Sequence, residues 1–363
     1  MNKIYSVWLH KLGIKEYIKL KMLHDFKTYK AVYDAQQKQY QMYGLNEKQL
    51  EKIYSSKNNL DEIQKLIKKC EALGVHILDL FDEDYPNELK QIPDPPLALF
   101  AMGNISYLNH PSIAIVGARK CSEYGFNITK RIAKELAEAG IAVISGMATG
   151  IDEAAHKGAL EQGITIAVLG TGIDICYPRT NYPIYRKIAE KGCIISEYPI
   201  GTPPLPFQFP KRNRIISGIS IGVLVTEAEE KSGSLITADL ALQYNKDIYA
   251  VPGNVESRFS IGTNKLIQQG AKLVINTEDI IDDLPMHVIM KINNNKIICY
   301  DKKNIELAQQ ESIVYDYVSW QPKYFSEIYS ELKLSYEMIN TALVKLELKG
   351  LIRRLPGERY VRV

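Results

Sequence analysis

Residues 112–117 read SIAIVG, and apolar runs of the same kind recur six times before residue 276. The further runs are IAVISG (141–146), TIAVLG (165–170), CIISEY (193–198), IGVLVTEA (221–228), DIYAVPG (247–253) and AKLVI (271–275). Runs without alternation between an inner and an outer face are typical of parallel strands that are covered on both faces. Because helical patterns separate the runs, we expect right-handed crossovers and a doubly wound, mostly parallel α/β sheet over residues 112–284.

The flanks of this segment have different patterns. Residues 1–75 place apolar side chains at helical spacing, as in EYIKLKMLHDF and LDEIQKLIKKCEAL, and predict a small helical domain. Residues 76–111 are rich in proline and turn residues and predict an ordered connector. Residues 285–309 predict a linker, with a loose segment or small hairpin around 293–295. Residues 310–363 give three helical patterns and a hairpin turning at Pro356 and Gly357, which is the order of a winged helix.

Composition narrows the class of protein. The chain has 363 residues, enough for several domains, and a formal net charge of +3, too small to attract a polyanion through the overall field. Its five cysteines are scattered and show no metal-ligand spacing, so we expect reduced thiols. The first residues are interrupted by charges and predict neither a signal peptide nor a membrane span, which favours a cytoplasmic location.

The loops after the predicted strands are rich in glycine and small polar residues. Ligands bind outside the carboxyl ends of the strands in such a sheet, and helix N-termini there present unpaired N–H groups to anions. One such loop is equally well explained as a tight turn with an N-cap, but five at one edge favour an anion site. The candidate residues are Gly117, Arg119, Ser122, Ser145, Gly146, Ser234 and Asn264.

A basic segment, FPKRNRIISGIS at 209–220, follows the loop of the fourth strand. It stands at the same sheet edge as Arg119, so the two together predict a track for phosphates. Phe207 and Phe209 either stack on bases or anchor the loop in the core. Arg214 lies in the helix predicted for RIISGIS and either contacts phosphate or braces the loop. The candidate contacts are Phe209, Lys211, Arg212, Asn213 and Arg214.

The sequence gives little support for catalysis. Neither G-x-G-x-x-G nor G-x-x-x-x-G-K-[ST] occurs, so the common nucleotide-binding fingerprints are absent. His156 lies in an alanine-rich helical stretch and is predicted to be a structural histidine. Asp152, Asp174 and Glu197 are acidic candidates that sequence alone does not bring together, and no nucleophile with a base is recognisable. We therefore expect no catalytic residue, no cofactor and no metal ion.

The same motifs resemble those of the DNA-processing protein A (DprA, or Smf) family of bacterial recombination mediators. VGARKCSEYG, SGMATGIDEAAHKGAL, LGTGIDICYPRTN, SEYPIGTPP, FPKRNRIISGIS, SGSLITADLA and AVPGN occur in the family's order, followed by GTNKLIQQGA. The resemblance implies an extended Rossmann-like domain that binds single-stranded DNA, flanked by a small helical domain and a winged helix. It also implies a non-enzymatic role in natural transformation, in which the protein protects incoming DNA, helps to load the RecA recombinase and forms a homodimer.

Residue by residue, the family's glycine-x-arginine matches Gly117 and Arg119, and its F-P-x-R-N-R element matches residues 209–214. The resemblance implies that these positions contact phosphates. The winged helix varies among family members. Its third helix mixes glutamate with lysine, so a DNA contact and a protein contact fit it equally well.

Two other classes of protein fit the chain less well. The glycine-rich sheet edge also resembles lysine-decarboxylase-like (LOG) enzymes, which cleave nucleoside monophosphates. Their P-G-G-x-G-T-x-x-E signature ends in a glutamate, whereas this chain has KSGSLITADLA at that place, which keeps an anion cradle without the acid. A transcription factor led by the winged helix fits least well, because most of the chain would then have no task.

Overall fold

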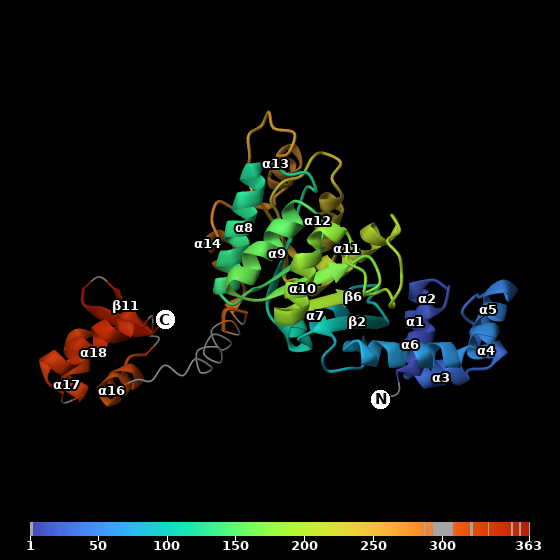
Figure 1. Cartoon of the computed structure of the whole chain (residues 1–363), viewed down its shortest axis with the longest axis horizontal. Coiled ribbons are helices and arrows are strands. Elements are labelled where there is room, and N and C mark those ends of the chain that lie inside the picture. Colours follow the sequence, from blue (N-terminus) through green and yellow to red (C-terminus); the bar gives the residue numbers. More distant parts are fainter. Residues whose placement is uncertain are drawn as a thin grey trace. The chain divides into compact units, whose positions relative to one another are not determined.

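The computed structural model describes residues 3–286, 288–290, 292, 308–319, 322–332, 334–349, 351–355 and 357–362. The chain divides into two compact units, Met1–Asn295 and Lys296–Val363, whose elements are labelled in Figure 1. The hairpin or linker predicted around residues 293–295, and Pro356 of the predicted wing turn, lie outside the described residues. Within the described ranges, no helix is long and apolar enough to cross a bilayer.

The first unit is built on a nine-stranded sheet with the strand order β1-β2-β6-β5-β4-β3-β7-β8-β9. All neighbours from β6 through β9 in this order pair in parallel, whereas β2 is antiparallel to both β1 and β6. The strands are β1 (Val75–Asp79), β2 (Ala98–Gly103), β3 (Ser112–Val116), β4 (Ala142–Ser145), β5 (Thr165–Leu169), β6 (Cys193–Ser196), β7 (Gly222–Val225), β8 (Asp247–Ala250) and β9 (Lys272–Leu273).

The chain order reverses between β3 and β7. From β3 the chain adds β4, β5 and β6 on one side, and then β7, β8 and β9 on the other. Crossovers that leave in opposite directions open a crevice at the carboxyl ends of the two central strands, where doubly wound folds bind their ligands. The topology therefore places a site above β3 and β7.

All seven runs predicted as strands form β3 to β9, and the expected α/β, mostly parallel sheet is confirmed. The connector prediction was incomplete, because residues 76–111 also supply β2 and nearly all of β1. These two strands are antiparallel additions at one edge of the sheet. Their short runs, VHILD and ALFAMG, are separated by a proline-rich stretch, and nothing in the sequence separates such strands from an irregular connector.

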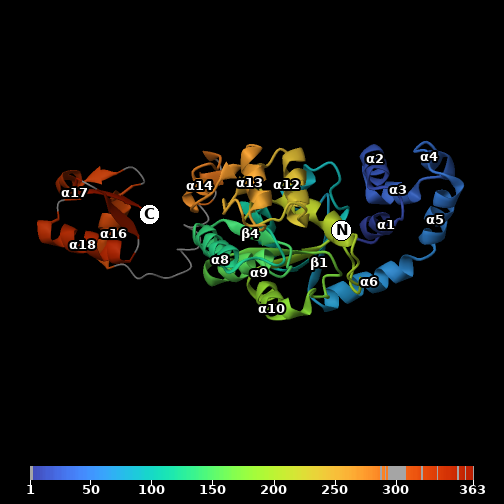
Figure 2. The ribbon, with the colours of Figure 1, turned by 90° about the horizontal axis from the view of Figure 1, so that it is seen from above.

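Helices cover both faces of the sheet. Apolar side chains of α8, α9 and α10 pack on one face, and those of α7, α11, α12 and α13 pack on the other. Figure 2 shows α12 and α13 on the opposite side of the sheet from α8, α9 and α10. The helices are α7 (Asn87–Lys90), α8 (Glu123–Glu138), α9 (Ile151–Gln162), α10 (Tyr182–Lys191), α11 (Gln208–Ile219), α12 (Gly233–Gln243), α13 (Ile261–Gln268) and α14 (Glu278–Ile281), with 3₁₀ turns η1 (Ile105–Asn109) and η2 (Arg179–Asn181).

Six helices precede β1, and two of them match the predicted helical segments. They are α1 (Ile4–Lys11), α2 (Glu16–Phe26), α3 (Tyr29–Asp34), α4 (Gln37–Gln41), α5 (Glu47–Lys57) and α6 (Leu60–Ala72). Their own apolar core surrounds the fully buried Trp8 and Tyr40. This core also includes Leu97, whose carbonyl oxygen accepts a hydrogen bond of 3.1 Å from the Tyr29 hydroxyl. The helical segment is thereby attached to the start of β2.

The second unit is the expected winged helix. It contains α16 (Gln309–Tyr317), β10 (Lys323–Tyr324), α17 (Phe325–Leu332), α18 (Tyr336–Leu348), β11 (Ile352–Leu355) and β12 (Arg359–Arg362). The strands form a separate sheet with the order β10-β12-β11. Val314, Ile328 and Leu343 are fully buried between the helices, so this unit has a core of its own.

Candidate functional site

A cavity of about 290 Å³ opens where the sheet topology predicts a site. We call it the switch-point cavity. Its walls come from the end of β3, the start of α9, one side of α11 and the start of α12. The lining residues are Val116, Gly117, Arg119, Ala148, Asp152, Pro206, Phe209, Pro210, Arg212, Asn213, Ile216, Ser232, Gly233, Ser234, Ile236 and Thr237.

Two of the predicted glycines allow elements to approach closely at this cavity. A Cβ atom on Gly117 would lie 2.6 Å from the Ile151 side chain, and one on Gly146 would overlap the guanidinium of Arg212. Contacts of this length are not found in real structures, so any larger residue would push the elements apart. Close packing is therefore a sufficient reason for glycine at both positions.

Arg119 stands exposed at the rim of the cavity. Its guanidinium lies 5.7 Å from the centroid of the Phe209 ring, within reach of a cation–π contact. No acidic side chain in the described part of the chain pairs with it. Phe209 also packs against Tyr177, with 5.5 Å between ring centroids, beside a smaller hollow of about 140 Å³. An uncompensated cation and two aromatic rings thus meet at one rim.

Arg212 lies beneath the cavity and is buried. Its guanidinium donates hydrogen bonds to the carbonyl oxygens of Gly146, at 2.6 Å, and of Val168, so it joins the ends of β4 and β5. Burial lowers the pKa of Arg212 to about 10, opposed by Asp152, and the group stays charged at neutral pH. Burial also raises the pKa of Asp152, against the effect of Arg212. The floor of the cavity therefore contains a fixed positive charge.

Lys211 and Arg214 lie on the other side of α11, away from the cavity lining. Arg214 is buried, pairs with Glu197 and lies 3.2 Å from an Asp94 oxygen. The Lys211 ammonium lies 3.4 Å from Glu197 and 3.7 Å from Glu16 of α2. Helix α11 begins at Gln208, so Lys211, Arg212 and Arg214 all lie within the helix. Their spacing places Arg212 on the face toward the cavity and the other two on the opposite face.

Glu197 is the centre of this charge cluster. Burial alone would raise its pKa, but Arg214, Lys211 and His10 more than offset that effect, and the pKa is lowered. His10 of α1 shares a hydrogen bond of 2.8 Å with the backbone oxygen of Glu197. The cluster therefore ties the N-terminal helices to the basic helix α11.

The remaining predicted residues have several partners. Asn213 and Ser234 line the cavity, and Asn213 accepts a hydrogen bond from Arg212 at 3.2 Å. Ser122 is the N-cap of α8 and donates its hydroxyl proton to Glu227, while Ser145 donates to the Ile115 carbonyl oxygen at 2.7 Å. Asn264 lies outside the cavity lining, in the first turn of α13, and braces Gly253 through two hydrogen bonds.

The acidic and histidine candidates are held apart by separate partners. Asp152 accepts backbone hydrogen bonds from Gly146 and Ala148, and Asp174 accepts one from Gly201. His156 is fully buried with its Nδ1 atom 2.7 Å from the Thr165 hydroxyl, and burial lowers its pKa to about 3. Across the described ranges, no three potential metal ligands gather into one cluster.

Sequence reasoning missed two residues that shape the site. Glu227 follows β7 and is buried, with its carboxylate accepting from the Ser122 backbone at 2.8 Å, which fixes the loop that carries Arg119. Tyr177 precedes Pro178 in the loop after β5 and extends the aromatic rim. Both residues lie in loops at the carboxyl ends of strands, so the predicted topology already indicated that they could lie near a site. Neither glutamate nor tyrosine is a residue type specific to anion binding, so the sequence did not single them out. Phe207, expected either as a core anchor or as a stacking platform, is 68% exposed.

Comparison with known proteins identifies two matching family models. Residues 76–285 match the model described as DNA recombination-mediator protein A, and residues 301–358 match the DprA winged helix domain. Protein Smf of Synechocystis is 32% identical over 350 residues, which is 88% of each chain. DNA processing protein DprA of Streptococcus pneumoniae is 43% identical over 203 residues, covering 56% of this chain and 72% of that protein.

Two solved structures are similar to large parts of this chain. The X-ray structure of DprA from Streptococcus pneumoniae has a TM-score of 0.71 and 34% identity, and the match covers 78% of this chain and 99% of that one. The structure of DprA from Helicobacter pylori, a protein described as having a unique single-stranded DNA binding mode, has a TM-score of 0.53 and 32% identity. That match covers 57% of this chain and 94% of the other.

Proposed function

Because the chain belongs to the DNA recombination-mediator protein A family, we propose that it binds single-stranded DNA at the switch-point cavity. The observation that carries this proposal is Arg119, an exposed cation that has no acidic partner among the described residues and is held over the Phe209 ring. Guanidinium groups bind phosphate, and exposed rings stack on bases of any sequence, which are the two requirements of a single-strand binder. The single-stranded DNA binding described for the Helicobacter pylori protein supports the same ligand.

The predicted contact residues take different roles in this proposal. Arg119, Phe209, Asn213 and Ser234 contact the strand, and Gly117, which also lines the cavity, lets Ile151 pack closely against the end of β3. Arg212 acts through its fixed charge beneath the cavity. Lys211 and Arg214 position α11 from its other face, while Ser122, Ser145, Gly146 and Asn264 hold the strand-end loops in place.

We further infer the biological role from family membership. The protein would protect incoming single strands during natural transformation and help to load RecA onto them, as a homodimer and without catalysis. The absence of chemistry is supported by His156, which is buried and uncharged, and by carboxylates that are occupied by separate partners. A LOG-like nucleotide-cleaving activity remains the alternative, and release of base from AMP above an Asp152→Asn background would establish it.

Fluorescence anisotropy with oligo-dT and a duplex of equal length, across a range of salt, tests the binding proposal. We expect a clear preference for the single strand. Arg119→Ala should lower the slope of log affinity against log salt by about 0.7, the loss of one phosphate contact. Lys120→Ala, an exposed neighbour outside the cavity lining, is the matched control and should keep most of the affinity. Equal affinity and slope in wild type and Arg119→Ala would contradict the site.

A further inference from the structure

The cavity is too small to hold a long strand. Together with the hollow beside Tyr177, its volumes of about 290 and 140 Å³ match a pocket for one small ligand. Single-strand binders usually contact about 4–16 nucleotides per domain. If the proposed function holds, as this inference requires, the rest of the strand leaves the cavity over its rim.

The two sides of the rim differ in charge. Near Ser232, which lines the cavity, Glu229 and Glu230 are exposed, and Arg258 pairs with Glu229 at 3.6 Å and Lys265 with Glu230 at 2.5 Å. Lys231 is also exposed there and forms no ion pair among the described residues. Carboxylates repel a phosphate backbone and compete with it for cations. This side of the rim therefore offers a strand one unpaired cation, Lys231, next to two carboxylates.

The other side is lined by Tyr177 and Pro178 and continues directly into Arg179, the first residue of η2. Helix α10 follows, and Ile184 and Ile188 of α10 belong to the same buried apolar cluster as Cys70 of α6, so the two helices cover the same part of the sheet. The outer sides of α10 and α6 therefore lie over the same part of the sheet, and α10 begins beside the rim.

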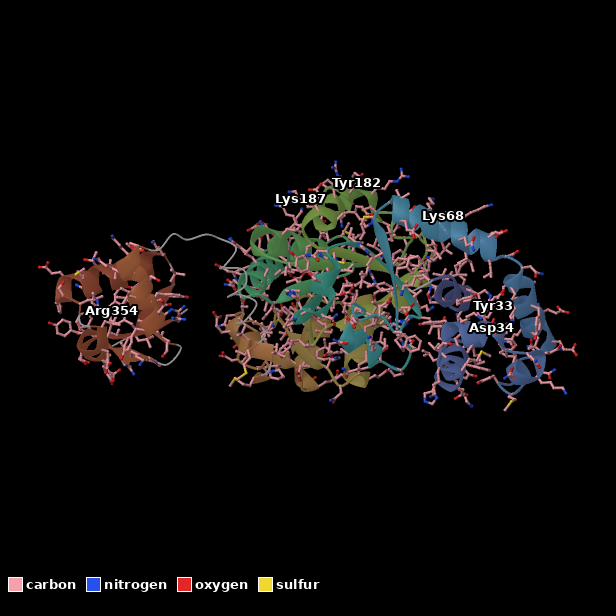
Figure 3. All side chains as sticks on the ribbon, turned by 90° about the horizontal axis from the view of Figure 1, so that it is seen from below. Tyr33, Asp34, Lys68, Tyr182, Lys187 and Arg354 are labelled. Carbon is pink, nitrogen blue, oxygen red and sulfur yellow. The ribbon has the colours of Figure 1, made fainter. Side chains whose placement is uncertain are left out.

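This outer surface carries cations without partners. Arg179, Lys187 and Lys68 are exposed, and none of them forms an ion pair with any side chain that the structure describes. Figure 3 shows Tyr182 and Lys187 on α10 and Lys68 on α6 projecting along one border of the molecule. Tyr177 and Tyr182 are 45% and 53% exposed, so aromatic rings accompany the cations.

We propose that a bound single strand leaves the cavity past Tyr177 and runs over α10 to α6. Arg179, Lys187 and Lys68 contact its phosphates there. The ring of Tyr182 is stacked on that of Tyr185, with 6.0 Å between the ring centroids. Tyr182 supplies a platform on which a base can stack. The surface recognises the strand by backbone charge and base stacking, without reading its sequence.

The test compares oligo-dT of about 5 nucleotides, which occupies the cavity and its rim, with oligo-dT of about 20 nucleotides, which also reaches the helices. The full-length chain and a triple variant, Lys68→Gln with Arg179→Gln and Lys187→Gln, are titrated by anisotropy across salt. On the long oligonucleotide the triple variant should lose tenfold or more in affinity at low salt, and its salt slope should fall by about 2, for three lost phosphate contacts. On the short one its affinity should stay within about twofold of wild type.

A second triple variant, Lys38→Gln with Lys48→Gln and Lys52→Gln, removes the same charge from exposed sites on α4 and α5 and is the control. Equal affinities of the two triple variants for the long oligonucleotide would overturn the inference. So would an equal loss on a duplex, since the surface would then serve duplex DNA. If Arg119→Ala leaves binding of the short oligonucleotide unchanged, the proposed cavity site fails, a result independent of the triple variants. A wild type that binds neither oligonucleotide refutes both proposals.

Discussion

Gly146 joins the end of β4 to the buried Arg212, and the contact leaves no room for a side chain. Its carbonyl oxygen accepts from Arg212, and a Cβ atom would overlap the guanidinium. Gly146→Ala should therefore displace Arg212 and lower the free energy of unfolding by about 1–3 kcal/mol, the usual cost of overpacking. Urea denaturation measures it. Gly233→Ala, where no atom lies within 4 Å of the added carbon, is the control and should not destabilise the protein.

His156 gives stability a pH dependence whose sign is fixed by its burial. Its pKa is about 3 in the folded protein and 6.5 in its ordinary state, so the unfolded chain binds the proton more readily. The stabilising contribution is complete above about pH 6.5 and is lost as pH falls toward 3, by about 1.4 kcal/mol for each pH unit.

His156→Gln tests this, because glutamine can keep a hydrogen bond to Thr165 without binding a proton. Between about pH 6 and pH 4 the free energy of unfolding should fall less steeply in the variant than in wild type. Burial lowers the pKa of His10 as well, so that histidine continues to contribute in both proteins. Parallel pH profiles for wild type and variant would show that His156 is not held uncharged.

At the scale of elements, α11 is positioned by unlike contacts on its two faces. One face lines the cavity through Phe209 and Asn213, and the other carries Lys211 and Arg214 into the cluster around Glu197. Glu197→Gln removes the charge that compensates the buried Arg214 and should cost about 3–5 kcal/mol of unfolding free energy.

The matched control for this substitution is Glu190→Gln. Glu190 forms an exposed pair with Arg186 at 3.5 Å, and such pairs contribute about 0–1 kcal/mol. The midpoint of thermal unfolding is measured for both variants and for wild type. Limited proteolysis then shows whether the N-terminal helices have become more accessible. Equal stability of Glu197→Gln and Glu190→Gln would mean that the cluster does not fasten α1 and α2 to the sheet.

The sequence predicted those elements whose pattern follows from burial. Strands β3 to β8 are covered on both faces, so each is a continuous apolar run that is visible without alignment. Strands β1 and β2 escaped notice because they lie across a proline-rich connector and pair antiparallel at the edge. Whether such a short run forms a strand depends on its pairing with a neighbouring strand in the fold, and the run itself does not encode that pairing.

The candidate site was predictable to a similar degree. The parallel topology brings Gly117, Arg119 and the basic segment to one edge, where Gly117, Arg119 and part of the segment (Phe209, Arg212 and Asn213) line the cavity. The division of α11 was not predictable, because it depends on where the helix begins. The sequence placed its start near Arg214, whereas it begins at Gln208. Because the helix begins earlier, Lys211 lies on its far side, away from the cavity and close to Glu16. Glu16 is distant in the sequence, so only the fold shows that the two are neighbours.

At the scale of the whole molecule, the contributions of the two units to folding and DNA binding can be tested separately by shortening the chain. A chain ending at Asp283 would have been the natural cut from sequence. However, Leu284, Val288 and Ile292 are buried in the same apolar cluster as α8 and α9, so that cut would remove three core side chains. Burial of each contributes about 1.5–3 kcal/mol, and the loss would strongly destabilise the sheet domain.

A chain ending at Asn295, the boundary of the first unit, should instead unfold at nearly the wild-type denaturant concentration. It retains the switch-point cavity and the α10–α6 surface, so its affinity for oligo-dT should stay within about threefold of the full chain, which anisotropy measures. The winged helix mixes charges of both signs on α18, and Arg354 of its wing is paired with Glu358 at 3.4 Å, which leaves Arg353 as an exposed cation of β11 without an ion pair among the described residues. If the shortened chain folds but loses nearly all affinity, the principal DNA contact lies in the winged helix and the cavity assignment is wrong.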